Sequence, residues 1–534
     1  MSFIHDNLAP LMFAGMIVFM LIGYPAAFSL AATGLFFGFI GIEFGLISPA
    51  FLGNLTYQLF GILSNDLLLA IPFFTFMGAI LERCGLAEDM LDSFGQLFGP
   101  VRGGMSYAVI FVGAVLGAIT GTVAASVIAM GVISMTPMIK YGYSTRHTMG
   151  VIAASGTITQ LIPPSLVLVV LADVLGRSVG DMYAGAIGPS IIQVGLFCLW
   201  VAIVSVIWPK DVPALPLEAR TLHGWALWKK ALRGIIPSLG LIFLVLGTMA
   251  LGLATPTEAG AMGVVGAIAL AASYGTLTWN LLYQGMASTM RLTAMVVYIL
   301  IGARVFSLVF QGLGGRDWIE HLLTSLPGGQ VGFLVFANAF IFVVAFFLDF
   351  FEIAFIIIPM LAPVADKLGI DLVWFGVLIC ANIQTSFMHP PFGFALFYLR
   401  GIAPPSIKTS DIYWGAIPWV FLQVILVIVV IFWPGSVTFW IDKGPVIDPG
   451  KIEIPLPQFG SSGLNIPAPN FGPTLPTTAP DLGGTQKAPD ATPVEPAKAE
   501  TPKAEEPKDA QPKEEQPKEG EPPKADDAKP AESK

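Results

Sequence analysis

Two short segments of the chain combine polar side chains with a pair of adjacent prolines inside strongly apolar sequence. The first reads SGTITQLIPPS, from Ser155 to Ser165, and the second reads NIQTSFMHPPFG, from Asn382 to Gly393. Proline has no amide hydrogen, and it disfavours helical geometry in the residue before it. Each Pro-Pro pair therefore predicts a helix that unwinds and then begins again.

An unwound turn at membrane depth can bind ions. Its exposed carbonyl groups can hold a small cation, and the N-terminus of the next half-helix attracts an anion. Unpaired backbone is not tolerated in contact with lipid, so such a break must lie inside protein or beside a water-filled cavity. We expect a re-entrant helical hairpin near residues 150–172 and another near 378–400. The alternative is that each Pro-Pro pair marks an ordinary loop between helices.

Polar residues and glycines surround each break, and backbone carbonyls as well as side chains can coordinate an ion. Around the first break they are Ser155, Gly156, Thr157, Thr159, Gln160 and Ser165. At the second break they are Asn382, Gln384, Thr385 and Ser386 before the prolines and Gly393 after them.

Two titratable side chains stand out in apolar sequence. Asp349 lies in LDFFEIAF, with Glu352 one turn later, and His389 directly precedes the second Pro-Pro pair. A carboxylate in a membrane helix costs roughly 2.5–3.5 kcal/mol on insertion scales and is a functional hypothesis by default. Asp349 could bind a cation, carry a proton, or act as a structural cap. His389 is either hydrogen-bonded in place or a source of pH sensitivity.

The elements that must position these residues are membrane helices. Of the 534 residues, 55% are hydrophobic and only 12% are charged, which leaves too little charge to cover a soluble protein of this size. Apolar runs near the ~20 residues that cross a bilayer recur about eleven times. Clear examples are Leu11–Leu30, Val109–Met130, Ile191–Trp208, Ile235–Leu253, Val331–Leu348 and Trp419–Trp433. The fold class is therefore an all-α polytopic membrane protein.

The chain divides into four parts: a first membrane half over 1–208, a connector over 209–234, a second half over 235–440 and a tail over 441–534. The connector is basic and aromatic, which predicts an amphipathic helix on the cytoplasmic surface. Landmarks recur in the same order in both halves, including Pro-Met, Pro-Pro and an Asp-x-Tyr segment, which indicates an internal duplication. The tail is rich in Pro, Lys, Glu and Ala, which predicts disorder. Its mixed charge does not suit nucleic-acid binding.

At this point the sequence resembles the large permease subunit of TRAP transporters, the tripartite ATP-independent periplasmic (DctM-like) systems, over roughly residues 5–440. The segments Gly150–Ser190 and Phe347–Pro404 carry most of the resemblance. It implies two inverted repeats arranged as a scaffold and an elevator-type transport domain in the bacterial inner membrane. It also implies sodium sites at the two turns, formed largely by backbone carbonyls. In this sequence they fall on Ser155, Gly156, Thr157, Pro163, Pro164 and Ser165, and on Asn382, Gln384, Thr385, Pro390, Pro391 and Gly393. One departure is Ser126, at a position where the family often has an acidic residue.

The resemblance further implies sodium-coupled import of an organic anion, usually a carboxylate, with no catalytic residues and no cofactor besides sodium ions. A periplasmic binding protein would deliver the substrate, and a small four-helix permease subunit would pack against this chain. The alternatives are a stand-alone elevator-type carboxylate symporter, coupled to sodium or protons, a channel, and a membrane-embedded enzyme. The enzyme is disfavoured because the sequence has no HExxH, DDxxD or Walker A motif.

Overall fold

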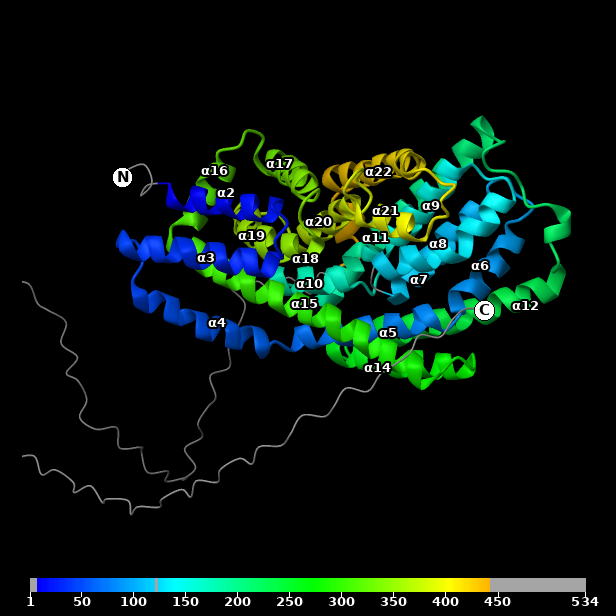
Figure 1. Cartoon of the computed structure of the whole chain (residues 1–534), viewed down its shortest axis with the longest axis horizontal. Helices are drawn as coiled ribbons and strands as arrows, with labels where there is room; N and C mark the ends of the chain where they lie inside the picture. The colour runs from blue at the N-terminus through cyan, green and yellow to red at the C-terminus, as the bar shows by residue number, and fades with distance from the viewer. Residues whose placement is uncertain (1–6, 121–122, 442–534) are drawn as a thin grey trace, which may run out of the picture. The chain divides into compact units, whose positions relative to one another are not determined.

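The structure is a computed structural model that describes residues 7–120 and 123–441, and within these residues it is helical with no strand (Figure 1). The helices before the connector are α2 Leu8–Leu21, α3 Ala26–Glu43, α4 Asn54–Leu63, α5 Asp66–Arg83, α6 Leu86–Leu97, α7 Gly104–Thr120, α8 Val123–Lys140, α9 Thr145–Thr157, α10 Leu166–Leu175 and α11 Val179–Ile207. The later helices are α12 Gly224–Ile242, α13 Thr248–Ala250, α14 Pro256–Ser273, α15 Trp279–Gly312, α16 Gly315–Thr324, α17 Gly329–Val344, α18 Phe350–Glu352, α19 Ile358–Lys367, α20 Leu372–Ser386, α21 Phe394–Ile402, α22 Thr409–Phe432 and α23 Gly435–Thr438.

Several of these helices can cross a membrane, which confirms the predicted polytopic class. In the described residues, seven are long and apolar enough, or up to nine if each of two bent pairs forms one span. Four shorter apolar helices accompany them. The apolar runs seen in the sequence therefore correspond to helices of three kinds: long single helices, bent pairs and short helices. The prediction of one helix over Leu11–Leu30 was wrong. A turn separates α2 from α3, with Gly23 at φ +89° and Pro25 directly before α3.

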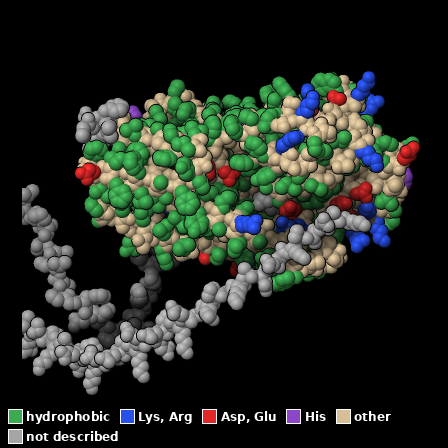
Figure 2. Space-filling model, viewed as in Figure 1, with side chains coloured by type: hydrophobic (Ala, Val, Ile, Leu, Met, Phe, Trp, Pro, Cys, Tyr) green, Lys and Arg blue, Asp and Glu red, His purple; other side chains and the backbone are tan. Residues whose placement is uncertain are grey.

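The connector between the halves is partly continuous with a membrane helix. Its helical part begins at Gly224 and runs to Ala250 as one candidate span, with a π-helical turn at Phe243–Gly247. In the face shown in Figure 2, Lys and Arg side chains gather toward the end where this helix begins, while hydrophobic side chains cover much of the rest. The cytoplasmic position of the connector remains a prediction. The tail was predicted to be disordered over residues 441–534. Residues 442–534 lie outside the residues that the structure describes.

The two halves repeat one order of elements. A left-handed glycine joins α5 to α6, where Gly85 has φ +81°, and another joins α15 to α16, where Gly314 has φ +75°. After these come the pair α7 and α8 in the first half, and α17 followed by α18 and α19 in the second. Each half then has an interrupted helix and a long final helix, α11 or α22. The structure thus has the element order that the duplicated landmarks predicted.

The helices form two packed groups. In one, α15 packs against α3 and α5, and α5 packs against α14. In the other, α9 packs against α7, α8 and α22, and α20 packs against α10 and α22. Every residue of α20 is buried, so α20 lies at the centre of the second group. At the contact of α9 with α22, a Cβ atom on Gly150 would lie 2.1 Å from the Gly415 carbonyl oxygen. Only glycine permits that approach.

Candidate functional site

The first Pro-Pro segment interrupts a helix, as predicted. α9 ends at Thr157, a 3₁₀ turn follows at Ile158–Gln160, and α10 begins at Leu166. The hydroxyl of Ser165 donates to the Gln160 carbonyl and accepts the amide N–H two residues later at 3.2 Å. Ser165 therefore caps α10 and closes the turn at the same time.

The second Pro-Pro segment also interrupts a helix. α20 ends at Ser386 and α21 begins at Phe394. In the turn between them, the Gly393 amide donates to the His389 carbonyl at 2.6 Å. A Cβ atom on Gly393 would lie 2.6 Å from the Phe387 carbonyl oxygen, so the turn has no room for a larger residue.

The two interrupted helices pack against each other. α9 packs mainly on α7, α8 and α22, while α10 packs on α20 and α11, so the halves of one helix have different neighbours. The predicted re-entrant hairpin geometry of each segment remains a prediction. α9 also packs on α21, and α10 packs on α20. The first part of one helix therefore meets the second part of the other, which is the pairing that an inverted repeat requires.

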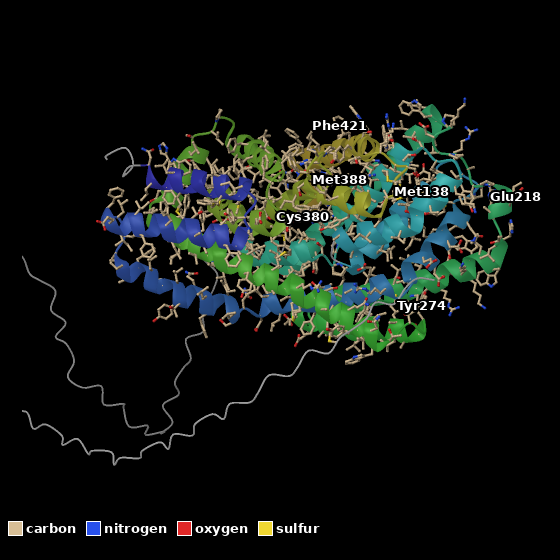
Figure 3. All side chains as sticks on the ribbon, viewed as in Figure 1. Met138, Glu218, Tyr274, Cys380, Met388 and Phe421 are labelled. Carbon is tan, nitrogen blue, oxygen red and sulfur yellow. The ribbon has the colours of Figure 1, made fainter. Side chains whose placement is uncertain are left out.

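Direct contacts join the two breaks. Cys380 Sγ donates to the Gln160 carbonyl at 3.3 Å, and Thr157 Oγ1 donates to Met388 Sδ at 3.4 Å. Gln423 of α22 also donates its amide N–H to Thr157 Oγ1 at 3.2 Å. Cys380 and Met388 lie in the middle of the helical body in Figure 3. The two breaks, which are distant in the sequence, therefore meet in one buried region.

Several polar atoms of this region are buried without a hydrogen-bond partner in the described residues. They are Ser155 Oγ, Gln160 Oε1, both amide atoms of Gln384 and both ring nitrogens of His389. Buried polar groups are nearly always paired, so each of these atoms is a candidate to bind water or an ion. Three of these atoms are side-chain oxygens available to a cation, since an amide carbonyl and a hydroxyl are both hard oxygen ligands. The chemistry of the donor set therefore fits sodium.

Other predicted ligands have structural contacts of their own. A Cβ atom on Gly156 would lie 2.3 Å from Val127 Cγ2, so Gly156 brings α9 close to α8. The Asn382 amide donates to the Asn338 carbonyl at 2.8 Å, and Thr385 Oγ1 donates to the Asn382 carbonyl at 2.7 Å. These side chains fix the helices around the breaks, and their coordination of an ion remains a prediction.

The prolines of the two breaks differ in burial. Pro163 and Pro164 are buried, whereas Pro390 is partly exposed and Pro391 is exposed. The Pro391 carbonyl accepts a hydrogen bond from Tyr413 Oη at 3.4 Å. The second Pro-Pro pair therefore lies nearer to the surface of the protein than the first.

His389 is packed against two aromatic rings, Phe342 of α17 and Phe346 of the turn that follows it. Its ring centroid lies 4.1 Å from that of Phe342 and 4.4 Å from that of Phe346. The side chain is buried although neither ring nitrogen has a partner in the described residues. The aromatic packing explains the position of the ring. The predicted role of His389 in cation or proton coupling remains a proposal.

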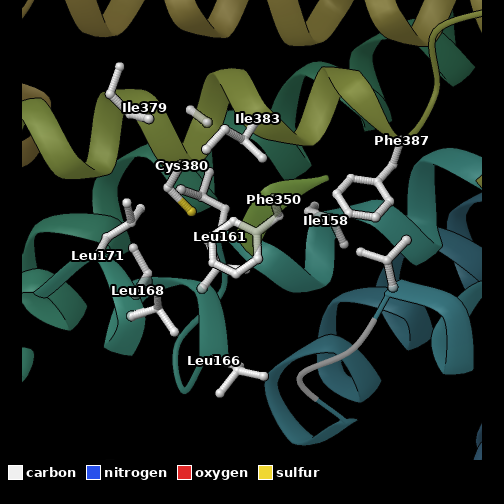
Figure 4. Close-up of a cluster of buried hydrophobic side chains, with 14 of the residues drawn as sticks. Ile158, Leu161, Leu166, Leu168, Leu171, Phe350, Ile379, Cys380, Ile383 and Phe387 are labelled. Carbon is white, nitrogen blue, oxygen red and sulfur yellow. The ribbon is translucent and has the colours of Figure 1, made fainter. Parts of the chain in front are cut away.

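A cavity of about 370 Å³ connects both breaks with α15 and contains the predicted carboxylate. Asp349, Glu352 and Gln160 are among its lining residues. Glu352 Oε2 accepts the Asp349 amide N–H at 3.0 Å, so the two carboxylate residues are held together at the start of α18. Figure 4 shows Phe350, another lining residue, between Leu161 of the first break and Phe387 of the second. The cavity lies where a transported solute could contact both repeats.

Two amides that sequence reasoning missed are Gln193 on α11 and Gln423 on α22. Both are buried, and neither amide atom of Gln193 has a partner in the described residues. Each is a lone polar residue in a long apolar run, and the two are 230 positions apart, the same offset that relates other landmarks of the duplication. Their equivalent positions in the two repeats could have identified both residues from the sequence.

Comparison with known proteins places this architecture in a family. Residues 13–436 match the model of the tripartite ATP-independent periplasmic transporter, DctM component. The chain is 29% identical over 391 residues to the C4-dicarboxylate TRAP transporter large permease protein DctM of Pseudomonas aeruginosa, covering 73% of this chain and 89% of that protein. It is 27% identical over 437 residues to the ectoine/5-hydroxyectoine TRAP transporter large permease protein UehC of Ruegeria pomeroyi, covering 82% and 99%.

A solved structure shares the fold. The YdaH transporter of Alcanivorax borkumensis superposes with a TM-score of 0.50 at 16% identity, covering 72% of this chain and 87% of that one. The family match extends over both halves and both breaks, and the helices confirm a multi-pass protein of the inner membrane. The protein is therefore a transporter subunit and not an enzyme, and the chain belongs to the DctM family of large permeases of tripartite ATP-independent periplasmic transporters.

Proposed function

We propose that this permease imports a small organic solute carrying a carboxylate group by sodium-coupled symport. The observation that supports the proposal most is the set of unpartnered buried oxygens on Ser155, Gln160 and Gln384, which belong to the two interrupted segments. A transporter needs a coupling-ion site that is buried, polar and shared between repeats. The buried contact between the two breaks, with its polar side chains from both repeats, supports the proposal.

The side chains and backbone of the two breaks would hold the ions. At the first break these are Ser155, Gly156, Thr157, Pro163, Pro164 and Ser165, and at the second they are Asn382, Gln384, Thr385, Pro390, Pro391 and Gly393. Bound sodium would supply the positive charge that attracts a substrate carboxylate. The rigid close packing of α9 on α22 would keep the oxygens of the first break in place.

Alternating access would come from movement of one helix group against the other. The group around α9 and α20 contains both breaks, whereas α15, packed on α3 and α5, borders the cavity from the other group. We assign the first group to the transport domain and the second to the scaffold. Sliding the transport domain along α15 would carry a solute in the cavity across the membrane with both breaks around it.

The partners follow from the family. A periplasmic binding protein would deliver the solute, and a small four-helix permease subunit would pack against the scaffold. Uptake into proteoliposomes would then require both partners. Uptake by this chain alone would instead indicate a stand-alone symporter.

The test of sodium coupling is a comparison of thermal stability in NaCl and KCl at equal ionic strength, with the chain purified together with its small partner. A cation that binds only the folded protein stabilises it by about 2.7 kcal/mol at a hundredfold excess over Kd. We expect a sodium-specific increase in melting temperature that saturates with concentration. Equal stability in the two salts across a wide concentration range would refute sodium binding and make proton coupling through Asp349 or His389 the better mechanism.

A further inference from the structure

The cavity between the two breaks and α15 has an unusual charge pattern for a site that would bind an anion. Two of its lining residues are the carboxylates Asp349 and Glu352, and no Lys, Arg or His occurs among the described residues that line it. Its volume of about 370 Å³ is within the range of roughly 300–1,000 Å³ typical of small-molecule sites. An ordinary dicarboxylate placed beside these two groups would meet electrostatic repulsion.

Aromatic rings make up much of the remaining wall. The lining aromatic residues are Phe350, Phe351, Phe387, Phe394 and Tyr398. All five come from the second repeat, and they include two adjacent pairs, with ring centroids 4.7 Å apart for Phe350 and Phe351 and 6.3 Å apart for Phe387 and Phe394. Aromatic faces attract cations, and sites that bind quaternary ammonium groups are built in this way.

A third feature of the cavity is a buried amide group. The Gln160 side chain lines it, is only 3% exposed, and has an Oε1 atom without a partner in the described residues. This oxygen is an acceptor, as are the carboxylates of Asp349 and Glu352. The cavity therefore presents acceptors and aromatic faces together, and both favour a ligand that carries positive charge or N–H donors.

We infer that the transported solute carries a positively charged nitrogen group, which Asp349, Glu352 and the aromatic wall bind. This inference rests on the proposed transport function and narrows its substrate class to zwitterions. The cationic nitrogen would lie in the aromatic part of the cavity next to the two carboxylates. The carboxylate of the same solute would point toward the breaks, where the bound sodium ions are proposed.

A matched pair of probes isolates the positive charge. Glycine betaine has a quaternary nitrogen where the tert-butylacetate anion has a carbon atom, and the two molecules are otherwise nearly identical in shape. Binding of each to the purified permease with its small partner would be measured by calorimetry in NaCl. We expect the betaine to bind at least about tenfold more tightly, the ratio that corresponds to about 1.4 kcal/mol.

Variants connect that preference to the cavity. Glu352→Gln and Asp349→Asn keep the shape of each side chain and remove its charge, so each should reduce the preference for betaine by about tenfold. Glu43→Gln, at an exposed carboxylate at the end of α3, is the control and should leave the preference unchanged. Melting temperatures of each variant, measured in parallel, separate misfolding from loss of binding.

Two results would overturn the inference. One is equal or tighter binding of tert-butylacetate or succinate, and the other is no detectable binding of betaine. The stability difference between NaCl and KCl without solute, measured in the same preparations, tests the proposed sodium coupling separately. A sodium-specific shift without a preference for betaine would retain the transport function and reject the zwitterion.

Discussion

Replacing Ser155 with alanine should stabilise the protein in potassium and reduce the additional stabilisation that sodium gives. Ser155 is fully buried in α9, and its hydroxyl has no partner in the described residues. The substitution Ser155→Ala removes one oxygen atom and adds no volume, so the packing of α9 on its neighbours should survive. The variant therefore changes the proposed ion site without the steric damage that any larger side chain at Gly156 would cause beside Val127.

The expected magnitudes follow from the environment of the hydroxyl. Leaving a buried polar group unpaired costs about 1–3 kcal/mol, so in KCl the variant should be more stable than the parent by up to about that amount. In NaCl at a hundredfold excess over Kd, the parent should gain about 2.7 kcal/mol. A variant whose Kd is tenfold weaker should gain only about 1.4 kcal/mol under the same conditions.

The assay is thermal unfolding in detergent across a sodium titration, with ionic strength held constant by KCl. Ser134→Ala is the matched control, because Ser134 is also a buried serine but donates its hydrogen bond to the Met130 carbonyl on α8. The control should lose stability equally in both salts. A Ser155→Ala variant that is less stable than the parent in KCl and keeps the full sodium effect would refute the idea that this hydroxyl is an ion ligand.

Two further predictions concern packing and pH. Gly150→Val should lower the melting temperature strongly, because its Cβ atom would lie 2.1 Å from the Gly415 carbonyl oxygen and overpacking alone costs about 1–3 kcal/mol. Burial acts to raise the pKa of Asp92, but hydrogen bonds, chiefly from Lys230, hold it below its usual value. A lowered folded pKa gives stability that is present above the unfolded pKa and lost as the pH falls through the folded one. Lys230→Met should therefore weaken the acid dependence of the melting temperature, while Lys229→Met should not.

Part of the site could be predicted from sequence because proline has strong local effects. The breaks after Thr157 and Ser386 follow from the two Pro-Pro pairs, since neither proline can donate a helical hydrogen bond. The order of elements in the two halves followed from repeated landmarks. These features depend on nearby residues and on spacing, which a sequence displays directly.

The remainder depends on tertiary contacts that no local pattern contains. The sequence does not show that Ser155 lacks a partner while Thr385 donates to a carbonyl of its own helix. It also does not show that Asp349 and Glu352 share a cavity with Phe387 and Phe394 of the second break. The single helix predicted over Leu11–Leu30 failed for a different reason, because apolar composition outweighed the turn signals of Gly23 and Pro25.

The contact between the interrupted helices has a consequence for the evolution of the protein. Because α9 packs on α21 and α22, and α10 packs on α20, each repeat completes its core only with parts of the other. Neither half could fold into a stable unit with a working site by itself. An ancestral protein of half this length would have needed two copies in opposite orientations, and a chain split into two genes today would need both products inserted together.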